Sequence, residues 1–133
     1  MGESVVRRVA VAIVLHEGRI LVAQRLPDAH LGGLWEFPGG KCEENELPEQ
    51  AARRELREEC GIDALTERIL PQLRHDYGDR IVDLTPVVCR WIRGEARPLG
   101  SAACRWVSRE ELRGLPMPAL NAEILDALDA ARL

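Results

Sequence analysis

Three glutamates are spaced to act together on a predicted helix. Glu55, Glu58 and Glu59 stand at positions i, i+3 and i+4, so their carboxylates share one helical face. Like charges at this spacing repel one another, and the arrangement calls for a compensating cation. A ligand set made only of oxygen atoms favours Mg²⁺ or Mn²⁺ over zinc. The alternative is a solvated acidic face that neighbouring arginines partly neutralise.

The chain around these glutamates carries the start and stop signals of one helix. Pro48 suits the first helical turn, where its missing N–H is not needed, and Gly61 suits the left-handed residue just past the end. Leu47 has no side-chain acceptor for the first turn, so we expect this helix to be poorly capped. The segment therefore reads as a glycine-rich loop followed by an acidic helix.

The spacing of this segment is more specific than its composition. It runs Gly40, five residues, Glu46, seven residues, Arg54-Glu55-Leu56, one residue, Glu58-Glu59, one residue, Gly61-Ile62. This resembles the signature of the Nudix hydrolases, G-x5-E-x7-R-E-U-x-E-E-x-G-U with U apolar, at every defined position. With common residues near 7% each, the matched identities would arise by chance on the order of 10⁻⁸ times per starting point.

The resemblance implies a metal site that acts on a diphosphate. In this family the signature helix holds divalent cations against the diphosphate of a nucleotide substrate, and water attacks a phosphorus atom. By resemblance the metal ligands are Glu55, Glu58, Glu59 and the carbonyl of Gly39. The chemistry agrees, because cations neutralise the bridging oxygens and activate water.

The resemblance also implies three catalytic residues. Glu55 is the first choice for the general base that takes the proton of the attacking water. Arg54 is expected to orient the carboxylates through a charge-assisted pair, with Glu46 as its partner.

Length and charge limit the possible partners. The 133 residues predict one domain spanning 1–133, with 46% apolar and 30% charged residues in an ordinary globular balance. A net charge of −4 argues against a nucleic-acid polymer or an anionic membrane as partner. A small anionic substrate would depend on bound cations and local arginines, and the protein is expected to be a monomer or homodimer.

The cysteines indicate the compartment. Cys42, Cys60, Cys89 and Cys104 stand at irregular spacings with no C-x-x-C pair. This favours buried or free thiols in a reducing cytosol over a zinc site or a disulfide framework, and predicts a cytoplasmic protein. No stretch of the sequence is long enough to span a bilayer.

Apolar periodicity predicts the remaining elements. Strands are expected at residues 5–15, 20–24, 34–37, 65–73, 80–91 and 104–107, with Pro71 forcing an edge or a bulge in the fourth. Ser108 and Glu111 form a capping box for a short helix, and a terminal helix is expected at about 120–133. The predicted fold class is α+β, a mixed β-sheet between helices, which is the α/β/α sandwich that the resemblance implies.

Within the family the chain is most similar to the MutT-like nucleoside triphosphate pyrophosphohydrolases, from about Val5 to Leu128. The segments that carry this similarity are Gln24-Arg25, Asp28-Ala29-His30, residues 34–41, residues 48–51, Asp79-Arg80 and residues 118–121. Such enzymes release a monophosphate and pyrophosphate, and the best-known members remove oxidised nucleotides such as 8-oxo-dGTP. The alternatives are a pyrimidine triphosphate, ADP-ribose or another dinucleotide as substrate, or a non-catalytic nucleotide-binding repair accessory domain.

Four residues are candidates for substrate binding, and each has a structural alternative. Asn121 can bond a purine edge bidentately, or cap the terminal helix. Arg25 can hold phosphate or base, or be a solvated charge at a strand end. Phe37 can stack on a base, although an aromatic residue in a short central strand is more often core. Arg80 can bind substrate or be an ordinary turn arginine.

The sequence departs from the MutT-like pattern at one ligand position. That pattern commonly places a glutamate six residues before the late-strand tryptophan, and here Trp106 counts back to Gly100. The acids considered as substitutes are Glu95, Glu43 and Glu44.

Overall fold

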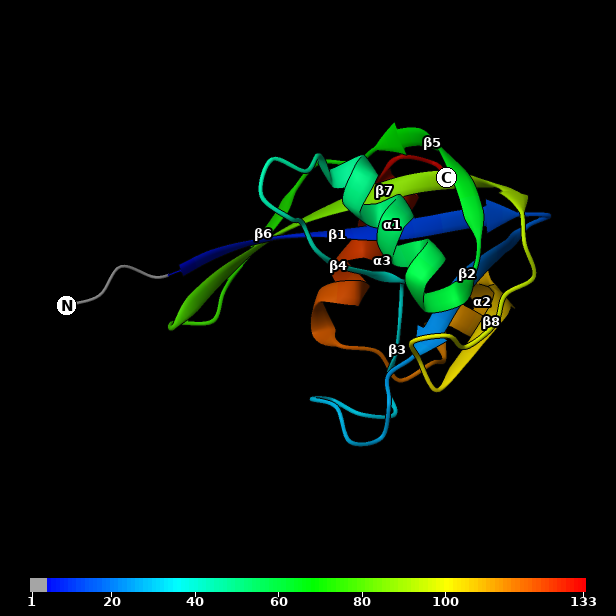
Figure 1. Ribbon diagram of the computed structural model, residues 1–133, viewed down its shortest axis with the longest axis horizontal. Helices are drawn as coiled ribbons and strands as arrows, with labels where there is room; N and C mark the ends of the chain where they lie inside the picture. Colours follow the sequence, from blue (N-terminus) through cyan, green and yellow to red (C-terminus); the bar gives the residue numbers. More distant parts are fainter. Residues whose placement is uncertain (1–4) are drawn as a thin grey trace.

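The computed structural model describes residues 5–133, so residues 1–4 of the predicted domain lie outside it. The strands are β1 (Val5–His16), β2 (Arg19–Gln24), β3 (Trp35–Glu36), β4 (Gly39–Lys41), β5 (Asp63–Ile69), β6 (Leu73–Asp76), β7 (Arg80–Arg93) and β8 (Ala103–Ser108). The helices are α1 (Pro48–Cys60), α2 (Arg109–Arg113) and α3 (Ala119–Ala130). Figure 1 shows them in chain order.

The described strands join into one mixed, eight-stranded sheet. Its central path is β3-β2-β1-β7-β5, while β4 pairs with β1, β6 with β7 and β8 with β2. β1 and β7 run parallel, and the other pairings are antiparallel. The predicted mixed sheet is therefore confirmed.

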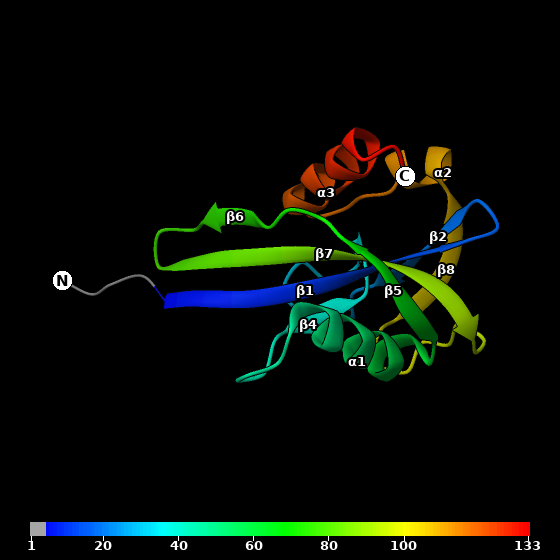
Figure 2. The same ribbon diagram turned by 90° about the horizontal axis from the view of Figure 1, so that it is seen from above.

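Helices cover both faces of the sheet (Figure 2), with α1 on one side and α2 and α3 on the other. Alternate residues of β1 point to the two sides. Ala12 packs in a buried cluster with Ala52 and Leu56 of α1, whereas the next residue, Ile13, packs in a second cluster with Ile124 of α3. Burial on both faces explains why the middle of β1 is apolar without interruption. The sandwich architecture agrees with the prediction.

One predicted strand, 65–73, is two strands in the structure. β5 ends at Ile69, and β6 pairs with the N-terminal half of β7, where Leu73 lies opposite Leu84. Between them the amide of Leu70 still donates to the carbonyl of Pro86 at 2.9 Å, but Pro71 has no N–H with which to continue the ladder. The proline thus separates two strands that each pair only with β7, so of the two expected alternatives the edge is correct and the bulge is not.

Smaller differences concern element boundaries. The expected glycine loop before α1 contains the short strand β4, which pairs Gly39 with Val11 and Lys41 with Val9. The terminal helix spans 119–130 instead of 120–133.

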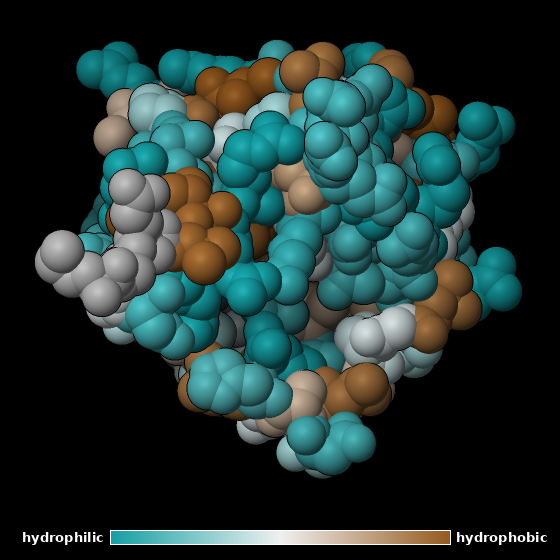
Figure 3. Space-filling view, turned by 60° about the vertical axis from the view of Figure 1, so that its left-hand side comes forward, coloured by the Kyte–Doolittle hydropathy of each residue, from teal (hydrophilic) through white to brown (hydrophobic). Residues whose placement is uncertain are grey.

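On the face shown in Figure 3 hydrophilic residues predominate, and the hydrophobic ones lie in separate groups.

Candidate active site

Helix α1 begins and ends as its sequence indicates, with one addition at the start. Leu47 is the N-cap and its side chain makes no capping hydrogen bond, but its N–H donates to the side-chain oxygen of Gln50 at 2.9 Å. Gly61 ends the helix with φ +70°. The expected poor capping is therefore compensated in part by Gln50.

Arg54 is the centre of an ion-pair network on the acidic face of α1. Its Nε and Nη2 each donate to a carboxylate oxygen of Glu46 at 2.9 Å, a bidentate pair. Its Nη1 donates to Glu55 Oε1 at 2.8 Å and approaches Glu58 Oε2 at 3.4 Å. The hydrogen bonds from Arg54 are the main reason that the pKa of Glu46 falls to about 2. One arginine thus contacts three of the predicted glutamates and holds Glu46 and Glu55 in place.

Glu59 lies apart from this network and faces β4. Its Oε2 accepts a hydrogen bond from the backbone amide of Gly39 at 2.9 Å. Burial raises the pKa of Glu59 to about 8, and the negative charges of Glu55 and Glu36 add to the rise, while the Gly39 amide opposes it. A carboxylate in this setting keeps its proton unless a cation compensates its charge.

Gly40 leaves room for the carboxylate of Glu55. A Cβ atom at Gly40 would lie 2.7 Å from Glu55 Cδ and 2.9 Å from Glu55 Oε1, closer than real Cβ contacts. The backbone of β4 therefore forms one wall of a small cradle around this carboxylate, and a side chain at Gly40 would fill it.

These residues fit a divalent cation in chemistry. The donors are all oxygen atoms, the carboxylates repel one another, and the partly buried Glu59 lacks a cationic partner among its hydrogen bonds. Within residues 5–133 no three His, Cys, Asp or Glu side chains already converge on one point. Glu55 and Glu58 are turned toward Arg54 instead, and Glu58, whose side chain is 58% exposed, is free to reorient.

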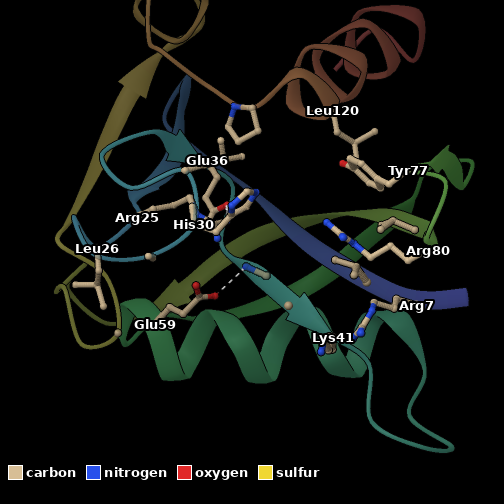
Figure 4. A pocket seen from close by; sticks show the side chains of 18 residues that line it. Arg7, Arg25, Leu26, His30, Glu36, Lys41, Glu59, Tyr77, Arg80 and Leu120 are labelled. Carbon is tan, nitrogen blue, oxygen red and sulfur yellow. Dashed lines mark hydrogen bonds and ion pairs between the residues drawn. The ribbon is translucent and has the colours of Figure 1, made fainter. Parts of the chain in front are cut away.

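A cavity of about 580 Å³ opens beside Glu59 and β4 (Figure 4). Its walls come from β1, the loop after β2, the turn between β6 and β7, and the start of α3. Basic residues outnumber acidic ones in its lining: the former are Arg7, Arg25, Lys41 and Arg80, and the latter are Glu36 and Glu59. The cavity therefore attracts anions although the whole chain is acidic.

Both predicted substrate-binding arginines line this cavity. Arg25 pairs with Glu36 at 2.8 Å and also donates to the carbonyl of His30 at 2.7 Å. The guanidinium carbon of Arg80 lies over the ring of Tyr77, 4.7 Å from the ring centre. Its Nη1 is 3.6 Å from Asp79 Oδ1. In Figure 4 the two arginines lie on different sides of the cavity.

Phe37 does not line the cavity, contrary to its assignment as a substrate-binding residue. Its side chain is only 1% exposed and packs in the core cluster with Val11 and Ile13. It cannot stack on a ligand from this position. The structural alternative, a core aromatic residue, is the correct interpretation.

Asn121 is next to the cavity and is not a helix cap. Helix α3 starts at Ala119 after the N-cap Pro118, which places Asn121 inside the first turn. The residue is 8% exposed, and its side-chain amide makes no hydrogen bond with the residues that the structure describes. Its neighbours Pro118 and Leu120 line the cavity, but Asn121 itself does not.

Gly100 lies where the MutT-like pattern places an acidic ligand. Its amide donates to the carbonyl of Glu59 at 3.2 Å, and a Cβ there would be 3.7 Å from Glu59 Cγ. The three acids considered as substitutes line other hollows of the surface. The acid that shares the cavity with Glu59 is Glu36, which the sequence analysis did not single out.

The comparisons with known proteins agree with this geometry. A family model described as NUDIX domain matches residues 9–127. The chain belongs to the Nudix family. Its similarity to MutT-like members shows that it is a hydrolase of that group.

The relatives of this Nudix chain carry related names. It is 52% identical to an "8-oxo-dGTP diphosphatase" of Proteus vulgaris over 66 residues, which span 50% of the chain and 59% of that relative. It is 36% identical to the "CTP pyrophosphohydrolase" of Escherichia coli over 93% of the chain and 92% of the relative. The solution structure of the E. coli ORF135 protein superimposes with a TM-score of 0.85 at 34% identity, covering 97% and 92% of the two chains.

Several cavity residues of this Nudix chain escaped the sequence analysis. Arg7 and Tyr77 reach the cavity because β1 and β7 pair in parallel, with Arg7 opposite Val82, and periodicity alone does not reveal that register. Lys41 could have been found, because it directly follows the glycine pair that precedes α1.

Among the helices of residues 5–133, none has the length and apolar character needed to cross a membrane.

Proposed function

We propose that this Nudix hydrolase cleaves a nucleoside triphosphate to the monophosphate and pyrophosphate, with oxidised purine nucleotides such as 8-oxo-dGTP as substrates. The observation that carries the proposal is the cavity itself, which brings the carboxylate of Glu59 and four basic side chains around one space. The name of the Proteus vulgaris relative supports the choice of substrate.

Glu55, Glu58 and Glu59, with the carbonyl of Gly39, would hold Mg²⁺ or Mn²⁺. Such a cation neutralises charge on the bridging oxygens and activates water. The oxygen-only donors and the raised pKa of Glu59 support this assignment.

Glu55 is proposed to accept the proton of the attacking water. Its Oε1 is held by Arg54 at 2.8 Å, while among the described residues Oε2 makes no hydrogen bond and is left to act as the base. The bidentate pair between Arg54 and Glu46 fixes the guanidinium. Arg54 therefore keeps Glu55 oriented, and Glu46 acts through Arg54.

The basic residues of the cavity are proposed to bind the phosphate chain and the nucleoside. Arg7 and Lys41 make no ion pair within residues 5–133 that would compete with a phosphate. Arg80 and Tyr77 lie across the cavity from Arg25, where a base could stack on the ring. The excess of basic over acidic side chains in the lining compensates part of the charge that a triphosphate brings.

A pyrimidine triphosphate is the second candidate substrate, because the full-length relative from E. coli is named "CTP pyrophosphohydrolase". ADP-ribose is the third, since a Streptococcus suis structure named "ADP-ribose pyrophosphatase" superimposes with a TM-score of 0.69 at 26% identity. The choice can be made by incubating the chain with Mg²⁺ and 8-oxo-dGTP, dGTP, CTP, 5-methyl-CTP or ADP-ribose. We expect pyrophosphate release to be fastest with 8-oxo-dGTP. Faster turnover of either pyrimidine, or AMP from ADP-ribose, would overturn this choice.

Asn121 is proposed to select the base by turning its side chain into the cavity that its neighbours Pro118 and Leu120 line. Its unpaired amide can offer both a donor and an acceptor to a purine edge. Asn121→Ala should lower the ratio of kcat/KM for 8-oxo-dGTP over dGTP roughly tenfold, the effect of about one lost hydrogen bond. Glu123→Ala, at an exposed position of the same helix, is the control. An unchanged ratio in Asn121→Ala would show that this residue only packs.

We also propose one Nudix domain over residues 1–133, as the single sheet and the family match over 9–127 support. The four free cysteines support a cytoplasmic location. We propose that the protein is a monomer or a homodimer. We also propose that it binds a small nucleotide and no nucleic-acid polymer. Light scattering coupled to gel filtration would measure the assembly directly.

A further inference from the structure

Two cysteines far apart in the sequence bring their sulfur atoms together. Cys60 is the last residue of α1 and Cys104 lies in β8, yet their Sγ atoms are 3.0 Å apart. A disulfide bond is about 2.05 Å long. Closing the pair would therefore take a movement of only about 1 Å.

The two sulfurs differ in their access to solvent. Cys60 is fully buried, whereas Cys104 is partly exposed. Cys104 lines a second cavity of about 380 Å³, together with His16, Trp91 and Trp106. A small oxidant can therefore reach Cys104 from this cavity, with Cys60 directly behind it.

Polar groups fix the position of the Cys104 sulfur. Its Sγ lies 3.3 Å from the hydroxyl of Ser101 and 3.5 Å from the carbonyl of Arg97, both on the loop before β8. These contacts hold the sulfur beside Cys60. The pair is thus pre-positioned by three separate segments: the end of α1, the loop and β8.

We propose that Cys60 and Cys104 form a reversible oxidation site, in which a peroxide converts the thiol pair to an intramolecular disulfide. Hydrogen peroxide first transfers one oxygen to Cys104, which becomes a sulfenic acid while one water leaves. The Cys60 sulfur then attacks the Cys104 sulfur, the S–S bond forms and the hydroxyl leaves as a second water. Two electrons and two hydrogens pass from the thiols to the peroxide, and an external dithiol reverses the reaction.

The bond would connect β8 to the end of α1, close to Gly100 and Glu59, which line the active-site cavity. Cys60 directly follows Glu59, whose carbonyl already accepts hydrogen bonds from the amides of Leu99 at 3.0 Å and Gly100 at 3.2 Å. A disulfide between Cys60 and Cys104 adds a covalent link beside these hydrogen bonds. The oxidised protein should therefore be more resistant to heat, and the midpoint of its thermal unfolding should rise by roughly 5–15 °C. This inference does not rest on the proposed function.

The other two cysteines supply the control. Cys42 is partly exposed and has no sulfur neighbour among the described residues, and Cys89 is buried in the core. Oxidation of the full chain should therefore remove two of its four titratable thiols, leaving Cys42 and Cys89.

The experiment treats the full chain with one equivalent of hydrogen peroxide, blocks free thiols by alkylation and maps peptides without reduction. We expect a Cys60–Cys104 peptide pair, a mass lower by two hydrogens, and recovery after dithiothreitol. Cys42→Ser should give the same result, and Cys104→Ser should not. Cys60→Ala, a small apolar replacement at a buried position, should instead leave a sulfenic acid on Cys104 that a dimedone probe captures.

Three outcomes would overturn the proposal. They are a bridge that includes Cys42 or Cys89, a bridge only between two chains, and irreversible oxidation of Cys104 in the unaltered protein without any bridge. A raised thermal midpoint that Cys104→Ser also shows after peroxide would likewise exclude the disulfide as its cause.

Discussion

The carboxylate of Glu59 and the backbone amide of Gly39 meet at 2.9 Å at the edge of the basic cavity. The glutamate belongs to the last turn of α1 and the glycine to β4, so the contact joins the helix to the strand that precedes it. One N–H does not neutralise a partly buried carboxylate that also faces other negative charges, and the pKa of Glu59 accordingly rises to about 8. Protonation would therefore compete with the metal binding that we propose for this residue.

This competition predicts a pH dependence for the metal-free protein. An unfolded glutamate titrates near 4.5, whereas Glu59 in the folded chain titrates near 8. Between these values the folded state holds a proton that the unfolded state has lost, so the free energy of unfolding falls as pH rises. Thermal unfolding in EDTA should therefore show a lower midpoint at pH 8.5 than at pH 5, and Glu59→Gln should reduce this difference.

Added Mg²⁺ should reverse the trend in the unaltered protein. Because Mg²⁺ should bind the ionised carboxylate, the apparent affinity of the protein for Mg²⁺ should rise as pH approaches 8. The increase that Mg²⁺ causes in the midpoint of thermal unfolding should therefore be larger at pH 8.5 than at pH 6. Glu59→Gln should bind Mg²⁺ more weakly and lose at least 100-fold in kcat. If Glu59→Gln kept the full Mg²⁺-dependent shift, Glu59 would not be a ligand.

Arg54 and Glu46 should behave as one unit in a double-mutant cycle. Arg54→Ala frees Glu55 as well as Glu46, so we expect a loss in kcat of roughly 10- to 100-fold. Glu46→Gln weakens only the support of Arg54 and should lose less. The double variant should be no slower than Arg54→Ala alone, because Glu46 acts only through the arginine.

The neighbouring arginine on α1 is the matched control. Arg57 pairs with Asp63 at 2.8 Å on the surface, and its side chain is 62% exposed. Arg57→Ala should leave kcat within about twofold, since exposed ion pairs contribute little. Fully additive losses in the double variant of Arg54 and Glu46 would mean that Glu46 has a separate role.

The sequence predicts the local parts of this site well and the long-range parts poorly. The span of α1 and the mixed sheet follow from caps and periodicity, which are properties of neighbouring residues. The pairing of Arg54 with Glu46 was implied by the resemblance to the Nudix family. Phe37 was misassigned because a core aromatic and a stacking aromatic have the same local pattern. Arg7 was missed because its place in the cavity depends on the parallel pairing of β1 with β7.

Gly100 offers a test by addition. A Cβ at this position would make ordinary contacts with Glu59, so a side chain can be accommodated without displacing the backbone. Gly100→Glu places a further carboxylate near the proposed metal ligands and should tighten Mn²⁺ binding several-fold. Gly100→Gln has the same shape without the charge and should not. Titration followed by the paramagnetic signal of free Mn²⁺ would measure both, and equal affinities would show that position 100 points away from the cation.

Gly40 tests whether the Glu55 carboxylate must keep its observed position. A Cβ at Gly40 would lie 2.7 Å from Glu55 Cδ, so Gly40→Ala forces that side chain to move. A displacement of this kind should lower kcat roughly 10- to 100-fold with little change in KM, because the substrate cavity is otherwise unchanged. The thermal midpoint should fall by only a few degrees, since the partly exposed carboxylate can turn toward solvent.

The control for this substitution is Gly114→Ala at the end of α2. Gly114 has a φ of −92°, and the nearest atom to an added Cβ is 3.6 Å away, so the methyl group fits. Gly114→Ala should keep both kcat and stability. A Gly40→Ala enzyme with normal kcat would show that Glu55 acts from another rotamer, and the proton acceptor would then have to be sought among the other carboxylates of the site.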